Sequence, residues 1–246
     1  MNDEKEDFYG EVFQQKSKNI RGIGRASVSD QSRLDLYKTY ENAISRISLP
    51  EPEFSADIQF WDIIQKRQTT RAFKRDPISI MDLSLLLFGM SGLTRKFPKF
   101  AFRTIPSAGG LFPIEIYVVA NNISDVEQGI YHYNIEKHEL ELLKQGDFTK
   151  TIVDACYGQR MVEKSAVNFI WTAMIERTRI TYKERAYRFI YLDCGHLGQN
   201  FYLAAEALGL SACVVGAYYD DEINEILELD EKKEFAIYMG IAGKRR

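Results

Sequence analysis

Apolar residues at helical spacing mark the point, near residue 55, where the chain changes from polar to globular sequence. Ile58, Trp61 and Ile64 predict a helix there, with Ser55 or Asp57 as its N-cap. A second helix is predicted next. Pro77 and Ser79 open it, with Asp82 in a capping-box-like position, and it ends near Gly89 or Gly92.

The spacing of the apolar residues then changes to that of strands. Residues 114–120 are β-branched and apolar, which indicates a buried strand, and residues 129–143 alternate around a Glu-Lys turn, which indicates a hairpin. The other predicted strands cover residues 167–173, 212–217 and 235–242, and short helices are predicted near 148–157 and 221–229. Helices and strands mixed in this way predict an α+β fold.

A long helix is predicted in the C-terminal half of the chain. Thr181 and Glu184 form a T-x-x-E capping box at its start, and Gly209 is a natural stop. Its apolar residues follow a heptad-like spacing and are Ala186, Ile190, Cys194, Leu197, Phe201, Ala204 and Leu208. Gly195 and Gly198 each cost about 1 kcal/mol relative to alanine in a helix interior. They predict a close backbone approach, either inside one domain or across a dimer interface, and the heptad-like spacing favours the dimer.

The chain divides into an N-terminal arm, residues 1–54, and a folded domain, residues 55–246. The arm is polar, contains one weak helical run near residues 8–16, and is closed by Pro50 and Pro52. A chain of 246 residues suffices for one large domain. We expect the arm to be an extension that packs on something else.

Composition and charge exclude several classes of function. The net charge of −3 gives no bulk attraction to nucleic acid or to an anionic membrane. The longest apolar run, residues 83–90, is far shorter than the ~20 residues of a membrane-spanning helix. The acidic N-terminus lacks the apolar segment of a secretory signal, and Cys156, Cys194 and Cys213 have no metal-ligand spacing. We expect a cytoplasmic protein with reduced thiols, no metal site, no membrane contact and no nucleic-acid partner.

The common hydrolase and phosphate-loop motifs are missing from the sequence. It has no G-x-S-x-G elbow, no P-loop and no H-E-x-x-H motif. His132 and His138 belong to the predicted hairpin and its turn, so we expect both at the surface. His196 lies inside the long helix, where we expect a hydrogen-bonded structural histidine.

Three segments have residues suited to a flat, phosphorylated ligand. Residues 67–71 carry two arginines and two hydroxyls, which suit a phosphate dianion but also fit a solvated basic face. Residues 106–113 are mostly small and lie between apolar segments, so the backbone can approach a flat ligand closely, although an ordinary turn has the same composition. Residues 243–246 place cations just beyond a strand, as a phosphate site or a frayed basic tail would.

Together these segments resemble the nitroreductase superfamily, and in particular its SagB-type branch of azoline dehydrogenases. Residues 67–73 read R-Q-T-T-R-A-F and resemble the superfamily's R-R-S-x-R-x-F motif. Residues 106–113 read P-S-A-G-G-L-F-P and resemble the branch's P-S-A-G-[AG]-L-[YF]-P motif. The hairpin and the G-H-x-x-Q-N stretch of the long helix also match, so the resemblance covers roughly residues 55–243.

The resemblance implies a nitroreductase-like FMN-binding fold, with a central mixed or antiparallel sheet flanked by helices. It also implies an obligate homodimer in which both chains contact each FMN at the interface. The residues implied at the phosphate are Arg67, Thr69, Arg71, Lys244 and Arg245, with Gln68 among them. The residues implied at the ring are Ser107, Ala108, Gly109 and Gly110 of the other chain, flanked by Pro106 and Leu111, with Val214, Val215 and Gly216 near the ring edge.

Members of the branch oxidise thiazolines and oxazolines in ribosomal peptides to azoles, with hydride transfer to flavin N5. The resemblance implies that a Lys-Tyr pair near the start of the long helix removes the Cα proton. This sequence has Thr181 and Tyr182 at that pair, and Lys183 follows one residue late. Tyr182 and Lys183 are the candidate catalytic residues. Either Lys183 or another cation compensates for the missing lysine, or the reaction is not azoline oxidation.

Four functions stay open at this point. The first is an FMN-dependent dehydrogenase acting on a heterocyclic or peptide-derived substrate, in a possible complex with a cyclodehydratase. The second is an NAD(P)H-dependent nitro or quinone reductase of the same fold. The third is a flavin oxidoreductase of another specialised pathway, and the fourth is a non-catalytic scaffold subunit of a biosynthetic complex.

Overall fold

A seven-stranded antiparallel sheet forms the centre of the protein in the computed structural model, which describes residues 8–21, 37–54, 58–97 and 100–246. The strand order is β1-β6-β5-β4-β7-β9-β8, and each neighbouring pair is antiparallel. The strands are β1 (Ser45–Ser48), β4 (Ile114–Ala120), β5 (Gly129–Asn134), β6 (Glu139–Gln145), β7 (Val167–Met174), β8 (Leu210–Val215) and β9 (Glu234–Lys244). The α+β prediction is confirmed, and the predicted strands agree with these to within a few residues.

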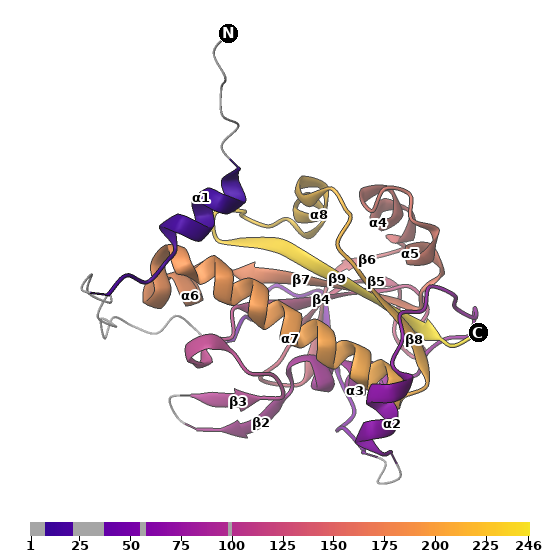
Figure 1. The fold of residues 1–246 in the computed structure, drawn as a ribbon. Helices are drawn as coiled ribbons and strands as arrows, with labels where there is room; N and C mark the ends of the chain where they lie inside the picture. Colours follow the sequence, from indigo (N-terminus) through magenta and orange to yellow (C-terminus); the bar gives the residue numbers. More distant parts are fainter. Residues whose placement is uncertain (1–7, 22–36, 55–57, 98–99) are drawn as a thin grey trace.

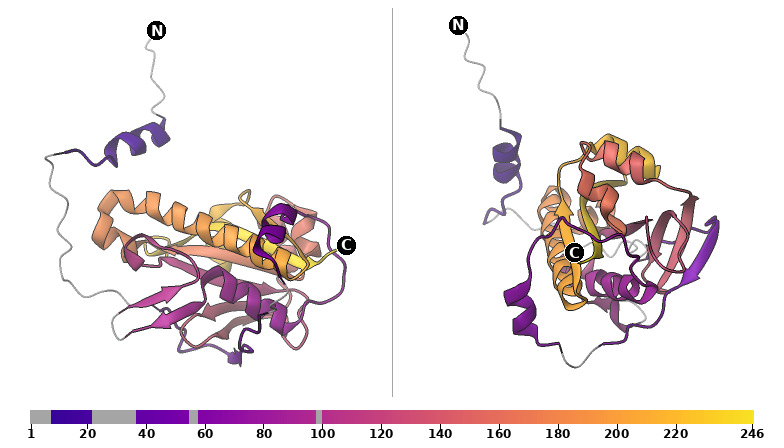
Figure 2. Two further views of the ribbon diagram at one scale, coloured as in Figure 1. Left: turned by 60° about the horizontal axis from the view of Figure 1, so that its bottom comes forward. Right: turned by 90° about the vertical axis from the view of Figure 1, so that its right-hand side faces the viewer.

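Helices cover both faces of the sheet, so the described part of the chain has three layers (Figures 1 and 2). One face carries α2 (Phe60–Lys66), α3 (Ile80–Ser91) and α7 (Ala186–Ala207), and the other carries α4 (Thr149–Ala155), α5 (Arg160–Lys164) and α8 (Asp220–Leu227). Strand β4 shows why both faces are buried. Ile116 and Val118 point into the core beneath α3 and α7, whereas Tyr117 and Val119 point into the core beneath α4 and α8.

The remaining elements surround this sandwich. They are α1 (Tyr9–Lys16), the β2–β3 hairpin (Leu93–Lys96 and Ala101–Arg103), the 3-10 turns η1 (Ala108–Gly110) and η2 (Lys183–Arg185), and α6 (Ile175–Tyr182). Helix α1 confirms the weak helical run and lies against the start of α7 (Figure 1), where Phe13 packs edge-on against Tyr187. None of the helices in the described ranges is long and apolar enough to cross a membrane.

The arm and the first helices differ in detail from the sequence prediction. Strand β1 lies inside the predicted arm but pairs with β6 at the edge of the sheet, so at least part of residues 1–54 packs into the fold. The N-cap of α2 is Gln59, while the predicted caps Ser55 and Asp57 lie outside the described residues. The capping box of α3 is confirmed, because Ser79 and Asp82 exchange both hydrogen bonds.

The predicted start of the long helix is wrong. Thr181 lies inside α6 instead of capping α7, and Lys183, with φ of 50°, interrupts the helical path between the two helices. A lysine rarely adopts a positive φ, so the local sequence offered no reason to predict a break at this residue. Tyr182 is therefore the last residue of α6, and α7 begins only at Ala186.

The heptad-like spacing of α7 reflects packing inside the chain. Ile190, Leu197 and Phe201 are buried against the chain's own sheet, so this spacing gives no support to a dimer. Gly198 faces the same core, because a Cβ there would lie 3.5 Å from the Trp171 ring. Gly195, in contrast, faces outward, and no atom of the described residues lies within 4 Å of the position that a Cβ would take there.

Candidate functional site

The loop of residues 106–113 turns the backbone outward just before β4. Gly109 and Gly110 have φ of 66° and 62°, and both are exposed. Glycine adopts this left-handed conformation without the steric cost that a Cβ brings, and it leaves the backbone open to a flat ligand. Phe112 also has a positive φ, of 45°, although it is not a glycine, so the surrounding contacts must hold it there.

The first half of the loop is tied to α7 by Asp193. The Ser107 hydroxyl donates a hydrogen bond to Oδ2 of Asp193 at 2.5 Å, and the Ala108 N–H donates to Oδ1 at 3.3 Å. The Phe112 N–H closes the turn by donating to Ser107 Oγ at 2.9 Å. Asp193 is only 3% exposed. Burial raises the pKa of this carboxyl, and the hydrogen bonds from Ser107 and Ala108 act in the opposite direction.

The second half of the loop is tied to α6 by Arg177. Its guanidinium donates to the Phe112 carbonyl at 3.2 Å and forms an ion pair with Glu115 on β4. Although burial alone would raise it, the charge of Arg177 and the hydrogen bond from His132 lower the pKa of Glu115 to about 2. The loop is therefore held at both ends by buried, charged hydrogen bonds.

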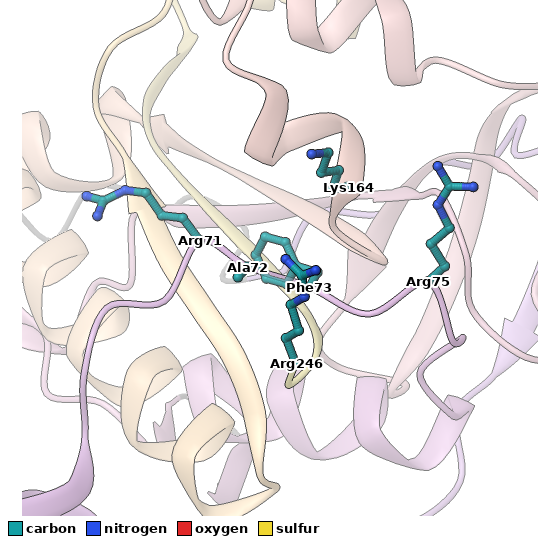
Figure 3. Close-up of a pocket in the computed structure, with 6 residues that line it drawn as sticks. All are labelled: Arg71, Ala72, Phe73, Arg75, Lys164 and Arg246. Carbon is teal, nitrogen blue, oxygen red and sulfur yellow. The ribbon is translucent and has the colours of Figure 1, made fainter.

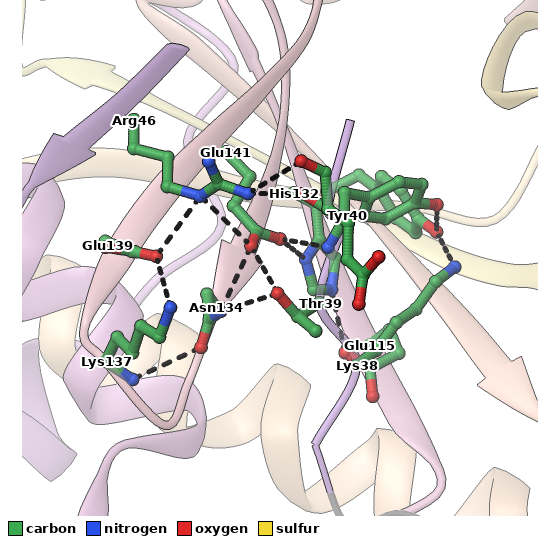
Figure 4. A network of polar contacts seen from close by, with 12 residues as sticks. Lys38, Thr39, Tyr40, Arg46, Glu115, His132, Asn134, Lys137, Glu139 and Glu141 are labelled. Carbon is green, nitrogen blue, oxygen red and sulfur yellow. Dashed lines mark hydrogen bonds and ion pairs between the residues drawn. The ribbon is translucent and has the colours of Figure 1, made fainter. Parts of the chain in front are cut away.

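The surface prediction for His132 and His138 is wrong. His132 is fully buried, and its two ring nitrogens each lie 2.9 Å from a carboxylate, Glu115 on one side and Glu141 on the other (Figure 4). Burial would lower the pKa of His132, but the hydrogen bonds to the two glutamates outweigh it and raise the pKa. His138 is partly buried and bonds to the Tyr133 hydroxyl. The alternating pattern of the hairpin suggested one solvent-facing side, but both faces of β5 are covered, so its polar residues are buried as well.

Tyr182 reaches the candidate loop from α6. Its hydroxyl oxygen lies 2.9 Å from the position that a Cβ on Gly109 would take. The Tyr182 ring packs against Phe189, with 4.5 Å between ring centroids. Lys183, the second candidate catalytic residue, is exposed. His196 is also exposed, so the expectation of a hydrogen-bonded structural histidine in this chain is not met.

The arginine motif gathers around Tyr202 of α7, a residue that the sequence did not single out. The Arg67 guanidinium stacks on the Tyr202 ring at 5.3 Å, and Thr69 Oγ1 lies 3.1 Å from the Tyr202 hydroxyl. The same hydroxyl accepts a hydrogen bond from the Val214 N–H at 3.0 Å. Tyr202 therefore contacts both the arginine motif of residues 67–71 and Val214, the first residue of the predicted 214–216 segment. Within that segment Val215 is buried and Gly216 is exposed.

Arg71 borders a cationic cavity of about 470 Å³ at the C-terminus. The residues that line this cavity are Arg71, Ala72, Phe73, Arg75, Lys164 and Arg246 (Figure 3). Four of the six have cationic side chains, and no acidic side chain is among these described lining residues. Gln68 is exposed but does not line the cavity. The positive charge of these residues suits an anion such as a phosphate, although the Arg71 guanidinium points away from Arg246 (Figure 3).

The tail cations fall into two groups. Lys244 lies 2.8 Å from Asp82, and Arg245 forms a two-bonded ion pair with Glu206, so a carboxylate already neutralises each of these predicted phosphate ligands. Arg246 belongs to the predicted 243–246 segment but was not among the residues implied at the phosphate, and it is the tail cation that lines the cavity. Successive residues of a strand point to opposite sides, so neighbouring cations in the tail meet different partners. The sequence of the tail alone does not predict those partners.

The two halves of the candidate site lie on opposite flanks of α7. Asp193 holds the 106–113 loop, and Tyr202 holds the arginine motif. Nine residues of α-helix correspond to about two and a half turns, so the two side chains are ~14 Å apart along the axis and point about half a circle apart. Within one chain, the glycine loop and the arginine motif therefore face different directions.

Comparison with known proteins identifies relatives over most of the chain. The model of the nitroreductase family matches residues 64–244. MJ1384 of Methanocaldococcus jannaschii, named as a candidate nitroreductase, is 34% identical over 81% of this chain and 96% of its own. The trifolitoxin-processing protein TfxB of Rhizobium leguminosarum is 31% identical over 55% of this chain, but the match spans only 38% of TfxB.

Solved structures share the fold. A protein of Anabaena variabilis, also named as a candidate nitroreductase, superposes with a TM-score of 0.78 at 24% identity, over 96% of this chain and 47% of that one. The Escherichia coli microcin synthetase complex McbBCD, solved with truncated pro-MccB17 bound, contains a chain with a TM-score of 0.62 at 22% identity. That match covers 80% of this chain and 77% of the other. The nitroreductase-like fold predicted from the sequence is confirmed.

The contact between Gly109 and Tyr182 can be tested by unfolding the protein in urea. Gly109→Ala should lower the free energy of unfolding by more than the about 1–2 kcal/mol that a left-handed alanine costs, because the new Cβ would also meet the Tyr182 hydroxyl at 2.9 Å. The matched control is Gly110→Ala, which has a similar φ but no described atom within 4 Å of its Cβ position. Adding Tyr182→Phe to Gly109→Ala should recover the excess loss. Equal losses in the two alanine variants would show that the contact is absent.

Proposed function

Because this chain belongs to the nitroreductase family, we propose that it is an FMN-dependent oxidoreductase of the SagB type, acting on a heterocyclic or peptide-derived substrate such as a thiazoline or oxazoline. One observation carries the proposal: the Tyr182 hydroxyl lies against Gly109 in the P-S-A-G-G-L-F-P loop. A proton-accepting group beside a flavin-facing turn is what dehydrogenation of a carbon centre requires. The resemblance to TfxB, a toxin-processing protein, supports the same substrate class.

The residues present fit FMN. Four cationic residues, Arg71 and Arg246 among them, line the cavity and would attract the phosphate dianion, and the exposed glycines at 109 and 110 leave room for a flat ring. Arg67 and Thr69 lie beside Tyr202 and would complete the polar end of the site. When bound, FMN supplies a two-electron acceptor for a hydride from the substrate. Lys244 and Arg245 would act at a distance, since each already has a carboxylate partner.

The chain itself would supply the proton chemistry. Tyr182 would accept the Cα proton of the substrate, and the turn at Gly109 would hold its hydroxyl in place. Positive charge nearby would favour this step. Lys183 follows Tyr182 directly, and the Arg185 guanidinium stacks at 5.6 Å on Phe189, the ring that packs on Tyr182. These two cations would replace the lysine that the branch has at position 181.

We also propose that the protein is a homodimer that shares its sites between chains. The glycine loop and the arginine motif lie on opposite flanks of α7, so a second chain would be needed to bring one of each to the same FMN. Large apolar side chains on the outer faces of α2 and α7 support this. Trp61 is 76% exposed and Leu192 is 58% exposed, and α2 packs beside α7.

The comparison with solved structures also supports a wider assembly. The fold is shared with a chain of the microcin synthetase complex, which was solved with its peptide bound. We propose that this chain acts in a cytoplasmic complex with a cyclodehydratase, on a peptide that the partner has already cyclised.

A second candidate function is an NAD(P)H-dependent nitro or quinone reductase. The name of MJ1384 and the threonine at position 181 favour it. Bleaching of the flavin by NAD(P)H under argon would support the reductase. Bleaching by an azoline peptide, with no nicotinamide present, would support the dehydrogenase.

Flavin binding can be tested by absorbance and by titration of the apoprotein with FMN. The purified protein should be yellow, with a band near ~450 nm and about one FMN per chain. Arg71→Ala and Arg246→Ala should each weaken FMN binding about tenfold or more, because one charge-assisted contact contributes about 1.5–3 kcal/mol. Lys74→Ala is the control, since this lysine lies between Arg71 and Arg75 but does not line the cavity. A colourless protein that takes up no added FMN would refute the flavin assignment.

The dimer can be tested by sedimentation at micromolar concentration. The wild type should sediment as a dimer, and Leu192→Glu should raise its dissociation constant by about tenfold or more, because a charge would be buried in an apolar contact. Tyr219→Glu is the control, since Tyr219 is an exposed aromatic residue at the start of α8, on the opposite face of the sheet. A monomeric wild type would overturn both the interface and the shared site.

Proton transfer can be tested with Tyr182→Phe. This variant should keep the flavin spectrum and the dimer but lower turnover by roughly 10²–10⁴. Thr181→Lys should raise activity on an azoline peptide, measured as loss of two mass units, and should cost no helix cap because Thr181 lies inside α6. Full activity of Tyr182→Phe on the native substrate would remove Tyr182 from the mechanism.

A further inference from the structure

The Ser107 hydroxyl has no hydrogen left to offer a ligand. Its one O–H donates to Asp193 Oδ2, and its oxygen accepts from the Phe112 N–H. The Ala108 N–H is likewise directed at Asp193 Oδ1. Two of the groups that the resemblance implies at the flavin ring are thus engaged inside the chain, and their common partner is a carboxylate.

Asp193 is suited to this position because an ionised carboxylate only accepts hydrogen bonds. Both groups that face it are donors, an O–H and an N–H. An asparagine has the same shape but would turn its own NH₂ group toward one of these donors or lose one bond. Asp193 lies in the middle of α7, away from the helix ends where backbone dipoles could compensate its charge.

The hydrogen bonds that Asp193 accepts from Ser107 and Ala108 form a clamp, and this clamp also affects the proposed proton acceptor. Asp193 fixes Ser107 and Ala108, and the next residue, Gly109, is the one whose Cβ position lies 2.9 Å from the Tyr182 hydroxyl. We propose, on the basis of the proposed function, that Asp193 is a positioning residue that acts through this turn in two ways. It presents the Gly109 backbone to the flavin ring and seats Tyr182, and it places a fixed negative charge behind the ring.

The charge has a measurable consequence for the flavin. A buried negative charge disfavours the addition of electrons nearby, so it lowers the reduction potential of bound FMN. Removing the charge in Asp193→Asn should therefore raise the ratio of reduced to oxidised flavin, at a fixed solution potential, by about threefold to tenfold. For a two-electron couple, the upper value corresponds to about 30 mV.

The experiment compares the holoenzyme of the wild type with Asp193→Asn, Ser107→Ala and Glu234→Gln. Glu234 is the matched control because it is also a buried carboxylate, but its side chain bonds to Lys38, Tyr117 and Thr172 and to no residue of the 106–113 loop. Three quantities are measured: the potential of bound FMN, kcat and KM separately, and hydrogen exchange of the 106–113 segment in the FMN-free protein.

We expect Asp193→Asn to raise the flavin potential, to lower kcat more than it raises KM, and to speed exchange in the 106–113 segment. Ser107→Ala should speed exchange but leave the potential near the wild-type value, because it removes the contact and keeps the charge. Glu234→Gln should change neither the potential nor the exchange of this segment, even where it lowers the stability of the protein.

Two results would overturn the inference. One is wild-type exchange in the loop of Asp193→Asn, and the other is an equal shift of potential in Asp193→Asn and Glu234→Gln. If the wild type binds no FMN, the proposed function fails on that observation alone. The exchange measurement still decides whether Asp193 positions the loop, because it is made without the flavin.

Discussion

The turn from Gly109 to Phe112 depends on two buried ionic clamps, and the rest of the candidate site depends on that turn. Phe112 has a left-handed backbone, which costs a residue with a Cβ about 1–2 kcal/mol. Its N–H reaches Ser107, and its carbonyl receives the Arg177 guanidinium. Both clamps involve an ionised group, and such hydrogen bonds are stronger than neutral ones. Without Asp193 and Arg177 the loop would keep only uncharged hydrogen bonds, such as those from Gly110 to Ser107 and from Met174 to Pro113.

The break between α6 and α7 is what lets both clamps reach the same loop. Arg177 and Tyr182 come from α6, which follows β7 directly, whereas Asp193 comes from α7. A single helix continuing through Lys183 would extend straight past the loop and could not present residues to it from two directions. The positive φ of Lys183 is therefore part of what the site requires of the backbone. This is also why the threonine at position 181 has no capping role.

Local patterns predicted the elements well, and tertiary contacts account for what they missed. The apolar run of β4, the strand pattern of β5 and β6, and the Ser79 capping box are local features, and the structure confirms these three strands and the box. The buried state of His132 is not local, because it depends on a second layer covering β5. Asp193 and Tyr202 carried no signal of their own, since their partners lie far away in the chain. Arg245 does not line the cavity, whereas Arg246 does, and Arg245 instead pairs with Glu206, a distant residue of α7 that the basic tail alone could not indicate.

Helix α7 sets the spacing of the whole candidate site. Its buried residues, such as Leu197 and Phe201, fix the rotation and height of the helix against the sheet. That placement positions Asp193 beneath the glycine loop and, about two and a half turns later, Tyr202 beneath the arginine motif. If α7 rotated about its axis, Asp193 and Tyr202 would both be displaced, and in opposite directions because they lie on opposite flanks. The heptad-like pattern therefore has a functional consequence even though it packs inside one chain: it determines how far apart, and on which flanks, the two halves of the site are held.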